Sequence, residues 1–445
     1  MNRKDTVIKV IEGILLLGFF SAISIQSASA KVYYVDIKGS DQGQGTKDSP
    51  WRTLNKALKS VNADQDHTIQ IGSGSFDLGG KITVPSGVKI IGSGIYATTI
   101  QGELHLRGGR NISLSKMQFN GKKYKYGTAV YIRDASQINL RDIAFRQYQS
   151  HAINIERTQN SELANLSIFD CTFNNRVPDK HSQQSAAIVL GNLTNVSFHE
   201  ISINTLTRGG QGIGSMSDAW KPQGNSWVGP DSILKNVKFA NLNIQVDKWN
   251  AWWNGWTPQM ALELFKHKCY ECEIYNSIFN GTVSLASIPT SQPDYQTRIH
   301  VHHNFWYGQN KPFYACEVSA NNIEFNHNYI RGGFYPIASF GNKYRNLHVH
   351  NNIFEQTQGP VLVGLFEQKR ENFQFINNII YVSHSKYPLF LFKKGEAENQ
   401  KIHNNSFYNL TENFQNLQLG ITVGLNKNFF LKFNPWQYRQ ESLKN

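Results

Sequence analysis

The sequence predicts an all-β chain folded as a single-stranded, right-handed parallel β-helix, and two observations support that prediction. A short pattern of alternating apolar residues followed by asparagine recurs along most of the chain, for example in the runs that begin at Asn322, Asn346 and Asn372. Its period drifts between 24 and 41 residues. Repeats of this length indicate a solenoid, and period-two alternation indicates strands rather than helices. The right hand follows from the handedness of parallel crossovers in general.

The first apolar residue of each unit is an anchor from which the coils can be counted. Stacking the units on their anchors pairs each strand with the equivalent strand of the next coil. The anchors are Ile112, Ile138, Leu166, Val196, Val237, Cys272, Ile299, Ile323, Leu347, Phe373 and, in a degenerate unit, Gln400.

An asparagine lies five residues after several of these anchors. In a stacked solenoid such side chains lie about 4.8 Å apart, close enough for their amides to bond one another and the backbone of the bend. Asparagine is common in turns generally, but one offset kept in five successive units favours a buried ladder. The residues are Asn304, Asn328, Asn352, Asn378 and Asn405.

Residues 1–30 have the pattern of a secretory signal peptide. Lys4 and Lys9 precede an apolar run that ends in small residues at Ala30. The run is shorter than the about 20 residues that span a bilayer, so we expect cleavage after Ala30 and a secreted or periplasmic protein without a membrane span. The remaining predicted segments are an N-terminal cap with the first coil (31–102), a β-helix (103–409) with loop insertions near 174–185, 205–232 and 246–260, and a C-terminal cap (410–445).

The segment after Lys31 contains, in order, Tyr33-Tyr34-Val35, Gly39-Ser40-Asp41, Gly45-Thr46, Ser49-Pro50-Trp51, Thr53-Leu54 and Ala57-Leu58. This order resembles the opening of secreted proteins of the pectate-lyase-like β-helix superfamily. The resemblance implies that a strand and a short helix cap the solenoid. The helical spacing of Trp51, Leu54, Ala57 and Leu58 agrees with such a helix.

The formal net charge of +13 favours anionic partners. Nucleic acid fits poorly, because the chain is expected to be exported and carries no basic run with interleaved aromatic residues. An acidic polysaccharide or an anionic cell surface fits better, although the charge could also serve only solubility. We expect a monomer.

Four cysteines in a chain of 445 residues are not a disulfide framework. Cys171 and Cys316 fall at positions expected to point inward. Cys269 and Cys272 could be buried thiols or one local disulfide, and they lack the second pair that a zinc site would need.

Six of the nine tryptophans fall in two neighbouring loop insertions. Flat indole rings stack on sugar rings, and the indole N–H can bond hydroxyl groups. Because long loops also need a small core, we expect two or three of the six to be structural. The others would line a saccharide groove together with polar residues of the loops. The tryptophans are Trp220, Trp227, Trp249, Trp252, Trp253 and Trp256, and the polar residues are Arg208, Lys221, Lys180 and His181.

Glu263 is the first catalytic candidate, because it follows the tryptophan-rich loop directly and is expected to point outward on a central coil. In β-elimination a base removes a proton beside a uronate carboxylate, and Lys266, His267 and Lys268 could supply cations and a base. In hydrolysis two carboxyl groups flank the glycosidic bond. Glu317, two coils away, could then form an inverting pair, which needs about 6.5 to 9.5 Å between the carboxyl groups.

A closer resemblance covers the run Glu263-Leu-Phe-Lys-His-Lys268 together with Ile274, Asn276, Phe279, Gly281 and Leu285. This layout is similar to that of the alginate lyase and chondroitinase B family. The resemblance implies that Glu263 binds Ca²⁺ and that Lys268 is the base. The chain departs from the family pattern at Ala261, where the family has a second Glu, and at Ala286 and Ser287, where it has an Arg.

The sequence therefore indicates a carbohydrate-active protein, and an acidic, uronate-containing polysaccharide cleaved by a polysaccharide lyase is the leading hypothesis. A glycoside hydrolase or a uronate epimerase on the same fold is the first alternative. A non-catalytic polysaccharide-binding or surface protein is the second.

The tryptophan hypothesis predicts the effect of Trp253→Ala. If Trp253 stacks on sugar, the variant binds an acidic polysaccharide more weakly, by the about 1 kcal/mol that one aromatic contact contributes. A binding isotherm on the wild type and the variant measures this. An unchanged isotherm with a lowered melting temperature would assign Trp253 to the core of its loop.

Overall fold

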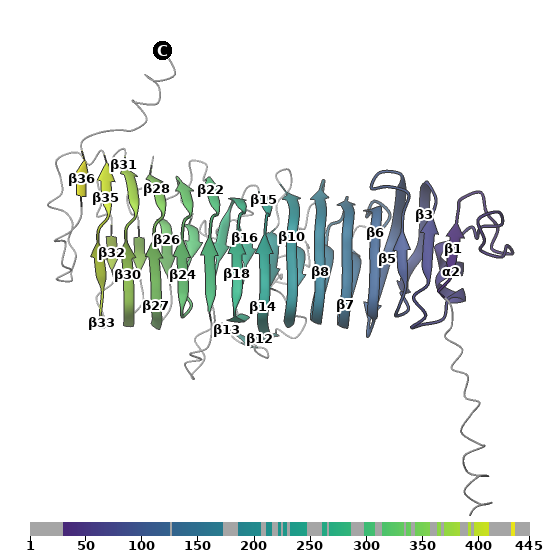
Figure 1. Cartoon of the computed structure of the whole chain (residues 1–445), viewed down its shortest axis with the longest axis horizontal. Coiled ribbons are helices and arrows are strands. Elements are labelled where there is room, and N and C mark those ends of the chain that lie inside the picture. The colour runs from purple at the N-terminus through teal and green to yellow at the C-terminus, as the bar shows by residue number, and fades with distance from the viewer. Residues whose placement is uncertain are drawn as a thin grey trace, which may run out of the picture.

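The structure is a computed structural model that describes most of the chain between residues 30 and 431. The described ranges are 30–124, 127–171, 186–205, 211–215, 221–223, 226–228, 232–246, 260–264, 267–285, 298–307, 314–332, 335–339, 343–356, 363–365, 369–382, 390–392, 396–408 and 429–431. Its strands stack in parallel along one long axis as a right-handed parallel β-helix, which confirms the predicted fold class (Figure 1). Within these ranges, no helix has both the length and the apolar composition needed to cross a membrane.

Each coil contributes strands to three parallel sheets, called A, B and C here. Sheet A begins with parts of four long strands, β3 (Gly74–Thr83), β5 (Thr98–Arg107), β7 (Thr128–Arg146) and β8 (His151–Phe169). It continues with β9 (Ala186–Leu190), β11 (Gln211–Ser215), β16 (Met260–Glu263), β20 (Thr282–Ser284), β23 (Tyr314–Glu317), β26 (Tyr335–Ser339), β29 (Val363–Leu365) and β32 (Phe390–Phe392).

Sheet B follows sheet A in each coil, and the long strands β7 and β8 bend into it. Its own strands are β1 (Val32–Val35), β2 (Thr68–Ile71), β4 (Lys89–Ile91), β6 (Arg110–Asn120), β10 (Leu193–Asn204), β14 (Ser232–Ala240), β17 (His267–Tyr270), β18 (Cys272–Tyr275), β21 (Ile299–His302), β24 (Ile323–Asn326), β27 (Lys343–His350), β30 (Lys369–Ile376), β33 (Glu396–Glu398) and β34 (Lys401–His403).

Sheet C completes each coil, and the ends of β6, β7, β8 and β10 belong to it. Its short strands are β15 (Asn243–Gln245), β19 (Ile278–Asn280), β22 (Phe305–Tyr307), β25 (Tyr329–Arg331), β28 (Ile353–Gln356), β31 (Ile379–Val382), β35 (Ser406–Tyr408) and β36 (Phe429–Leu431). Because β36 pairs with β35, this sheet extends past residue 409 into the predicted C-terminal cap. A separate antiparallel hairpin consists of β12 (Lys221–Gln223) and β13 (Ser226–Val228).

The N-terminal end of the solenoid carries β1 and the helix α2 (Leu54–Ser60) (Figure 1). The helix begins where it does because the Thr53 side chain caps it, accepting a hydrogen bond from the Lys56 N–H. Leu54, Ala57 and Leu58 are buried, which confirms the helical spacing read from the sequence.

Sharp bends between the strands are made by residues in the left-handed region. In one coil Asn346 has φ 55° and Asn351 has φ 57°, and equivalent residues of other coils are mostly asparagine or aspartate. These side chains tolerate the left-handed conformation better than other residues with a Cβ do. The repeated asparagines therefore fix where each coil turns.

The predicted asparagine ladder forms at the turn between sheets B and C. Asn328 donates its side-chain N–H to Oδ1 of Asn352 at 3.1 Å, and Asn352 donates in turn to Asn378 at 3.0 Å. The same Oδ1 of Asn352 also accepts from the backbone N–H of Asn328 at 2.9 Å. All five predicted ladder residues are at most 2% exposed. Each amide thus satisfies backbone groups that the turn would otherwise leave unpaired.

Inward side chains fill the space between the sheets with apolar residues. They stack coil on coil, as in Phe198 and Phe239, whose ring centroids are 5.1 Å apart. All four cysteines are buried and unbridged. The inward positions expected for Cys171 and Cys316 are therefore confirmed, and Cys269 and Cys272 are thiols in this structure.

One predicted anchor was wrong. The register places Ser161, not Leu166, opposite Val196, while Leu166 pairs with Ile143 and Ile201 on sheet C. Ser161 is 6% exposed, and its hydroxyl donates to the Gln159 carbonyl at 2.8 Å and accepts from the Ile138 N–H at 3.0 Å. The apolar alternation failed here because a small polar side chain met its hydrogen-bond needs locally and could replace an apolar one in the interior.

The ladder predicts a large cost for Asn352→Ala. The change removes the acceptor of two Asn328 N–H donors and the donor to two carbonyl groups, so we expect a loss of at least about 2 kcal/mol in the free energy of unfolding. Urea or thermal unfolding measures it. The control is Asn243→Ala, which removes an exposed asparagine from β15 and should change stability little. Equal stability of both variants would contradict a structural role for the ladder.

Candidate functional site

The two predicted catalytic glutamates lie in one row on the outer side of sheet A. Glu263 on β16 is opposite Ser284 on β20, and Ser284 is opposite Glu317 on β23. Leu262, which precedes Glu263, and Val283, which precedes Ser284, point inward and are buried at 0% exposure. The prediction that the two carboxyl groups lie two coils apart on the same face is therefore confirmed. Two rungs correspond to about 9.6 Å between the backbones.

Glu317 has the more unusual environment. It is partly buried, and it accepts hydrogen bonds from the Ser284 hydroxyl at 2.7 Å and the Ser319 hydroxyl at 3.4 Å. Burial raises the pKa of Glu317, and the two hydroxyl groups oppose this only in part. A carboxyl group held in this way keeps its proton to a higher pH than an exposed one, which is the property of a general acid.

Of the lysine and histidine candidates, the two that the structure describes, His267 and Lys268, do not join this row. His267 is the clear correction: it is 2% exposed, with neither ring nitrogen hydrogen bonded, and burial lowers its pKa to about 3. β17 lies past the corner from β16 and pairs with β14 of sheet B. His267 therefore points into the solenoid, where it cannot contact a polymer, and Lys268 lies on the outer side of sheet B.

The same outer row of sheet A extends toward the N-terminus with larger polar side chains. His105 pairs with Tyr131 on the next strand, and Tyr131 pairs with Asn154. The His105 and Tyr131 rings are 5.2 Å apart. Beside them, Arg133 and Glu156 form an ion pair, with Nε of Arg133 3.5 Å from Oε2 of Glu156.

Much of the predicted saccharide-binding set lies outside the described residues. This applies to Lys180, His181, Arg208, Trp220, Trp249, Trp252, Trp253, Trp256 and Lys266, and to the predicted signal peptide before Ala30. Lys221 and Trp227 belong to the β12–β13 hairpin, of which only the backbone is described.

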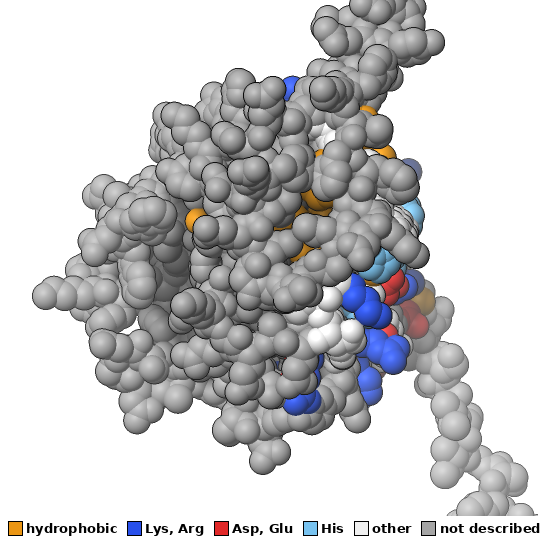
Figure 2. All heavy atoms as spheres, turned by 90° about the vertical axis from the view of Figure 1, so that its left-hand side faces the viewer, with side chains coloured by type: hydrophobic (Ala, Val, Ile, Leu, Met, Phe, Trp, Pro, Cys, Tyr) orange, Lys and Arg blue, Asp and Glu red, His pale blue; other side chains and the backbone are white. Residues whose placement is uncertain are grey.

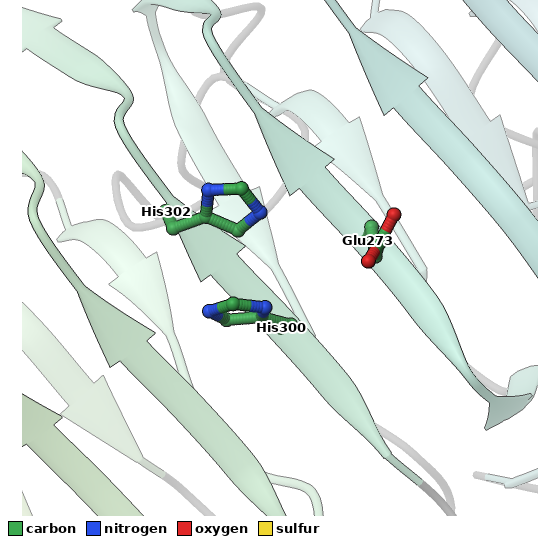
Figure 3. A group of neighbouring side chains, drawn as sticks. All are labelled: Glu273, His300 and His302. Carbon is green, nitrogen blue, oxygen red and sulfur yellow. The ribbon is translucent and has the colours of Figure 1, made fainter.

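The sequence reasoning missed a cluster of histidines on the outer side of sheet B. Figure 2 shows histidine side chains gathered on one flank of the solenoid, next to acidic and basic ones. One row there pairs Glu273 with His300, and a second pairs Tyr275 with His302. One side-chain donor atom from each of Glu273, His300 and His302 lies within 4.8 Å of the other two (Figure 3).

The pKa values of two histidines on this face are lowered. Burial, and then the neighbouring His300 and His303, lower the pKa of His302 to about 4, while Glu273 raises it. Burial also lowers the pKa of His348, two coils further along. A signal for this cluster was present in the sequence, because His-x-His recurs at His300 and His348 at the same offset from the anchors.

Comparison with known proteins gives a matching family model but no activity. A family model described as "Protein of unknown function (DUF1565)" matches residues 37–247. No curated protein sequence matches the chain.

Among solved structures, PfbA, a surface adhesin of Streptococcus pneumoniae, is 11% identical with a TM-score of 0.46, over 80% of this chain and 88% of the adhesin. A rhamnogalacturonan lyase is 12% identical with a TM-score of 0.42, over 84% and 87%. An alginate lyase from Paenibacillus sp. str. FPU-7 is 12% identical with a TM-score of 0.42, over 77% and 99%. These similarities assign no chemistry to the residues of this chain.

The environment of Glu317 predicts a pH-dependent effect of Glu317→Gln. Because the pKa of Glu317 is raised in the folded chain, the folded state binds the proton more tightly than the unfolded state does. Stability is therefore lost as pH rises from the unfolded pKa through the folded one. The neutral glutamine avoids this loss. The melting temperature of the variant, relative to that of the wild type, should therefore be higher at pH 8 than at pH 4.

Ser284→Ala is the matched control for that experiment. It removes the hydrogen bond that stabilises the ionised carboxylate, so it should lower the melting temperature more at pH 8 than at pH 4. Parallel pH profiles for the wild type and Glu317→Gln would show that Glu317 does not titrate with a raised pKa.

Proposed function

We propose that this protein is a carbohydrate-active enzyme that hydrolyses glycosidic bonds over sheet A, with Glu317 as general acid and Glu263 as general base. The observation that carries the proposal is the row Glu263, Ser284, Glu317, in which two carboxyl groups share one face and burial raises the pKa of Glu317. Acid–base hydrolysis requires two carboxyl groups, one of which keeps its proton to a higher pH than usual.

Glu317 suits the acid role because burial favours its protonated form. In that form it can donate its proton to the glycosidic oxygen as the bond to the sugar breaks. The Ser284 and Ser319 hydroxyl groups then stabilise the carboxylate that remains. The row thus supports both protonation states that the acid passes through.

Glu263 suits the base role because it lies two rungs from the acid on the same face. A separation of about two rungs leaves room for a water molecule as well as the sugar, which favours inversion over retention. Glu263 would deprotonate that water as it attacks the anomeric carbon from the opposite side.

The formal net charge of +13 supports an acidic polysaccharide as the substrate class. Export is the matching proposal for location, since such polymers lie outside the cytoplasm. The pattern of residues 1–30 supports it, and N-terminal sequencing of protein recovered from the medium or periplasm tests the cleavage after Ala30.

β-Elimination by a polysaccharide lyase is the second candidate, and the basic net charge favours it because a uronate carboxylate must be neutralised. It needs a base beside Glu263. With His267 in the interior, the resemblance to the alginate lyase and chondroitinase B family implies Lys268 as that base, and Lys266 is the other lysine that follows Glu263 in sequence. Ca²⁺ bound by Glu263 belongs to this candidate.

One assay separates the two reactions. The full chain is incubated with a panel of acidic polysaccharides, with Ca²⁺ or with EDTA, while reducing ends and the absorbance of unsaturated uronates near 235 nm are followed. Hydrolysis produces reducing ends without the absorbance, and proton NMR of the first product should show the inverted anomer. A rise in absorbance establishes elimination instead.

The assignment of roles predicts the kinetics of two variants. Glu317→Gln and Glu263→Gln should each lower kcat by about 10²- to 10⁴-fold, because each removes one proton-transfer group. Glu355→Gln, which removes a carboxylate on sheet C that pairs with Arg331 at 3.4 Å, is the control and should keep full activity. Full turnover by Glu263→Gln or Glu317→Gln would remove that residue from the reaction.

A further inference from the structure

The cluster on sheet B brings three metal-binding side chains to one point. Glu273 projects from β18, and His300 and His302 project from β21, the next rung. The two imidazole ring centroids are 4.1 Å apart. Figure 3 shows one nitrogen of each ring on the side where the Glu273 carboxylate lies. Two imidazoles and a carboxylate at such distances are a ligand set for a divalent transition metal.

The second nitrogen of each imidazole is already held by a neighbour. The Nε2 of His300 lies 2.9 Å from the side-chain nitrogen of Asn326, and the Nδ1 of His302 lies 2.8 Å from Nδ1 of His303. Within the described part of the chain, the other nitrogens, Nδ1 of His300 and Nε2 of His302, have no hydrogen-bond partner. These contacts hold both rings in place. Because the Asn326 N–H donates to Nε2 of His300, coordination through Nδ1 of His300 requires the ring proton to move to Nε2 and the Asn326 amide to turn its oxygen toward it.

A surface ion pair is the competing arrangement. The Lys238 amine lies 3.2 Å from one oxygen of Glu273, with side chains 48% and 37% exposed. Such exposed pairs contribute little free energy, because solvent screens the two charges. Lys238 can therefore move aside, or share the carboxylate with an ion bound to its other oxygen.

The same ligand pattern occurs again two coils further on, with a different outcome. Glu324 on β24 lies opposite His348 on β27, and His350 follows. There, however, Glu324 is bonded to His350 at 3.2 Å and to Asn326 at 3.1 Å. Among the described residues, only the first set of three converges within 4.8 Å.

We propose that Glu273, His300 and His302 form a binding site for one Zn²⁺ ion, or a similar late first-row divalent ion, with a remaining coordination position open to water. Nitrogen donors disfavour Ca²⁺ and Mg²⁺, which prefer oxygen ligands. The ion joins two adjacent rungs, β18 and β21, so it also ties these coils together. The site is separate from the glutamate row on sheet A and does not depend on the proposed hydrolysis.

Zn²⁺ titration of the full chain without a histidine tag tests the proposal. Calorimetry should give one site per chain, and Zn²⁺ should raise the melting temperature, an effect that EDTA reverses. X-ray absorption at the zinc edge should show two imidazoles in the coordination shell. An excess of Ca²⁺ should not displace Zn²⁺ from this site.

The variants locate the site. His300→Ala and His302→Ala should each weaken Zn²⁺ binding at least about tenfold, and Glu273→Gln should weaken it less while keeping the side-chain size. His348→Ala is the matched control, since it removes the histidine two rungs along the same row as His300 and should leave the affinity unchanged. Circular dichroism confirms that each variant is folded.

Two outcomes would overturn the proposal. Absence of Zn²⁺ binding by the wild type would show that the cluster is only a set of packed surface side chains. Equal weakening by His300→Ala and His348→Ala, with more than one ion per chain, would show that zinc adsorbs to the whole histidine face.

Discussion

Register between coils is the constraint on which the rest of this structure depends. All sheet pairings along the described solenoid are parallel. Each strand residue therefore lies next to the equivalent residue of the coils before and after it. The buried asparagine ladder enforces that register at the turn between sheets B and C, since each amide bonds both the next amide and the backbone of the neighbouring coil. A slip of one residue would break these bonds and turn the inward side chains outward.

The register also decides where chemistry can occur. It converts residues about two dozen positions apart in sequence into direct neighbours, so a site needs only one suitable residue per coil. The row Glu263, Ser284, Glu317 on sheet A and the pair Glu273, His300 on sheet B both arise in this way. Inward positions of the strands are closed to chemistry, which is why His267, an inward residue of β17, is confined to the core.

The two clusters differ in what their environments favour. On sheet A, burial favours the protonated form of Glu317, and hydrogen bonds from neighbouring hydroxyl groups partly stabilise its carboxylate. On sheet B, burial and mutual repulsion keep His302 without a proton, so its nitrogen lone pair is available. The first environment suits proton donation and the second suits coordination. A single solenoid can hold both because its sheets face different directions and their outer rows are independent.

The sequence by itself determined the fold class, the asparagine ladder and the pairing of Glu263 with Glu317 across two coils, because all three follow from a repeat that can be counted. It misplaced one anchor where Ser161 replaces an apolar residue, since a polar side chain can be buried when its partners are local. It could not decide that His267 points inward, because the corner after Glu263 resets the alternation. Only the tertiary structure showed that Glu273, His300 and His302 converge while Glu324, His348 and His350 do not, because that difference depends on side-chain hydrogen bonds between coils, which the repeat pattern does not encode.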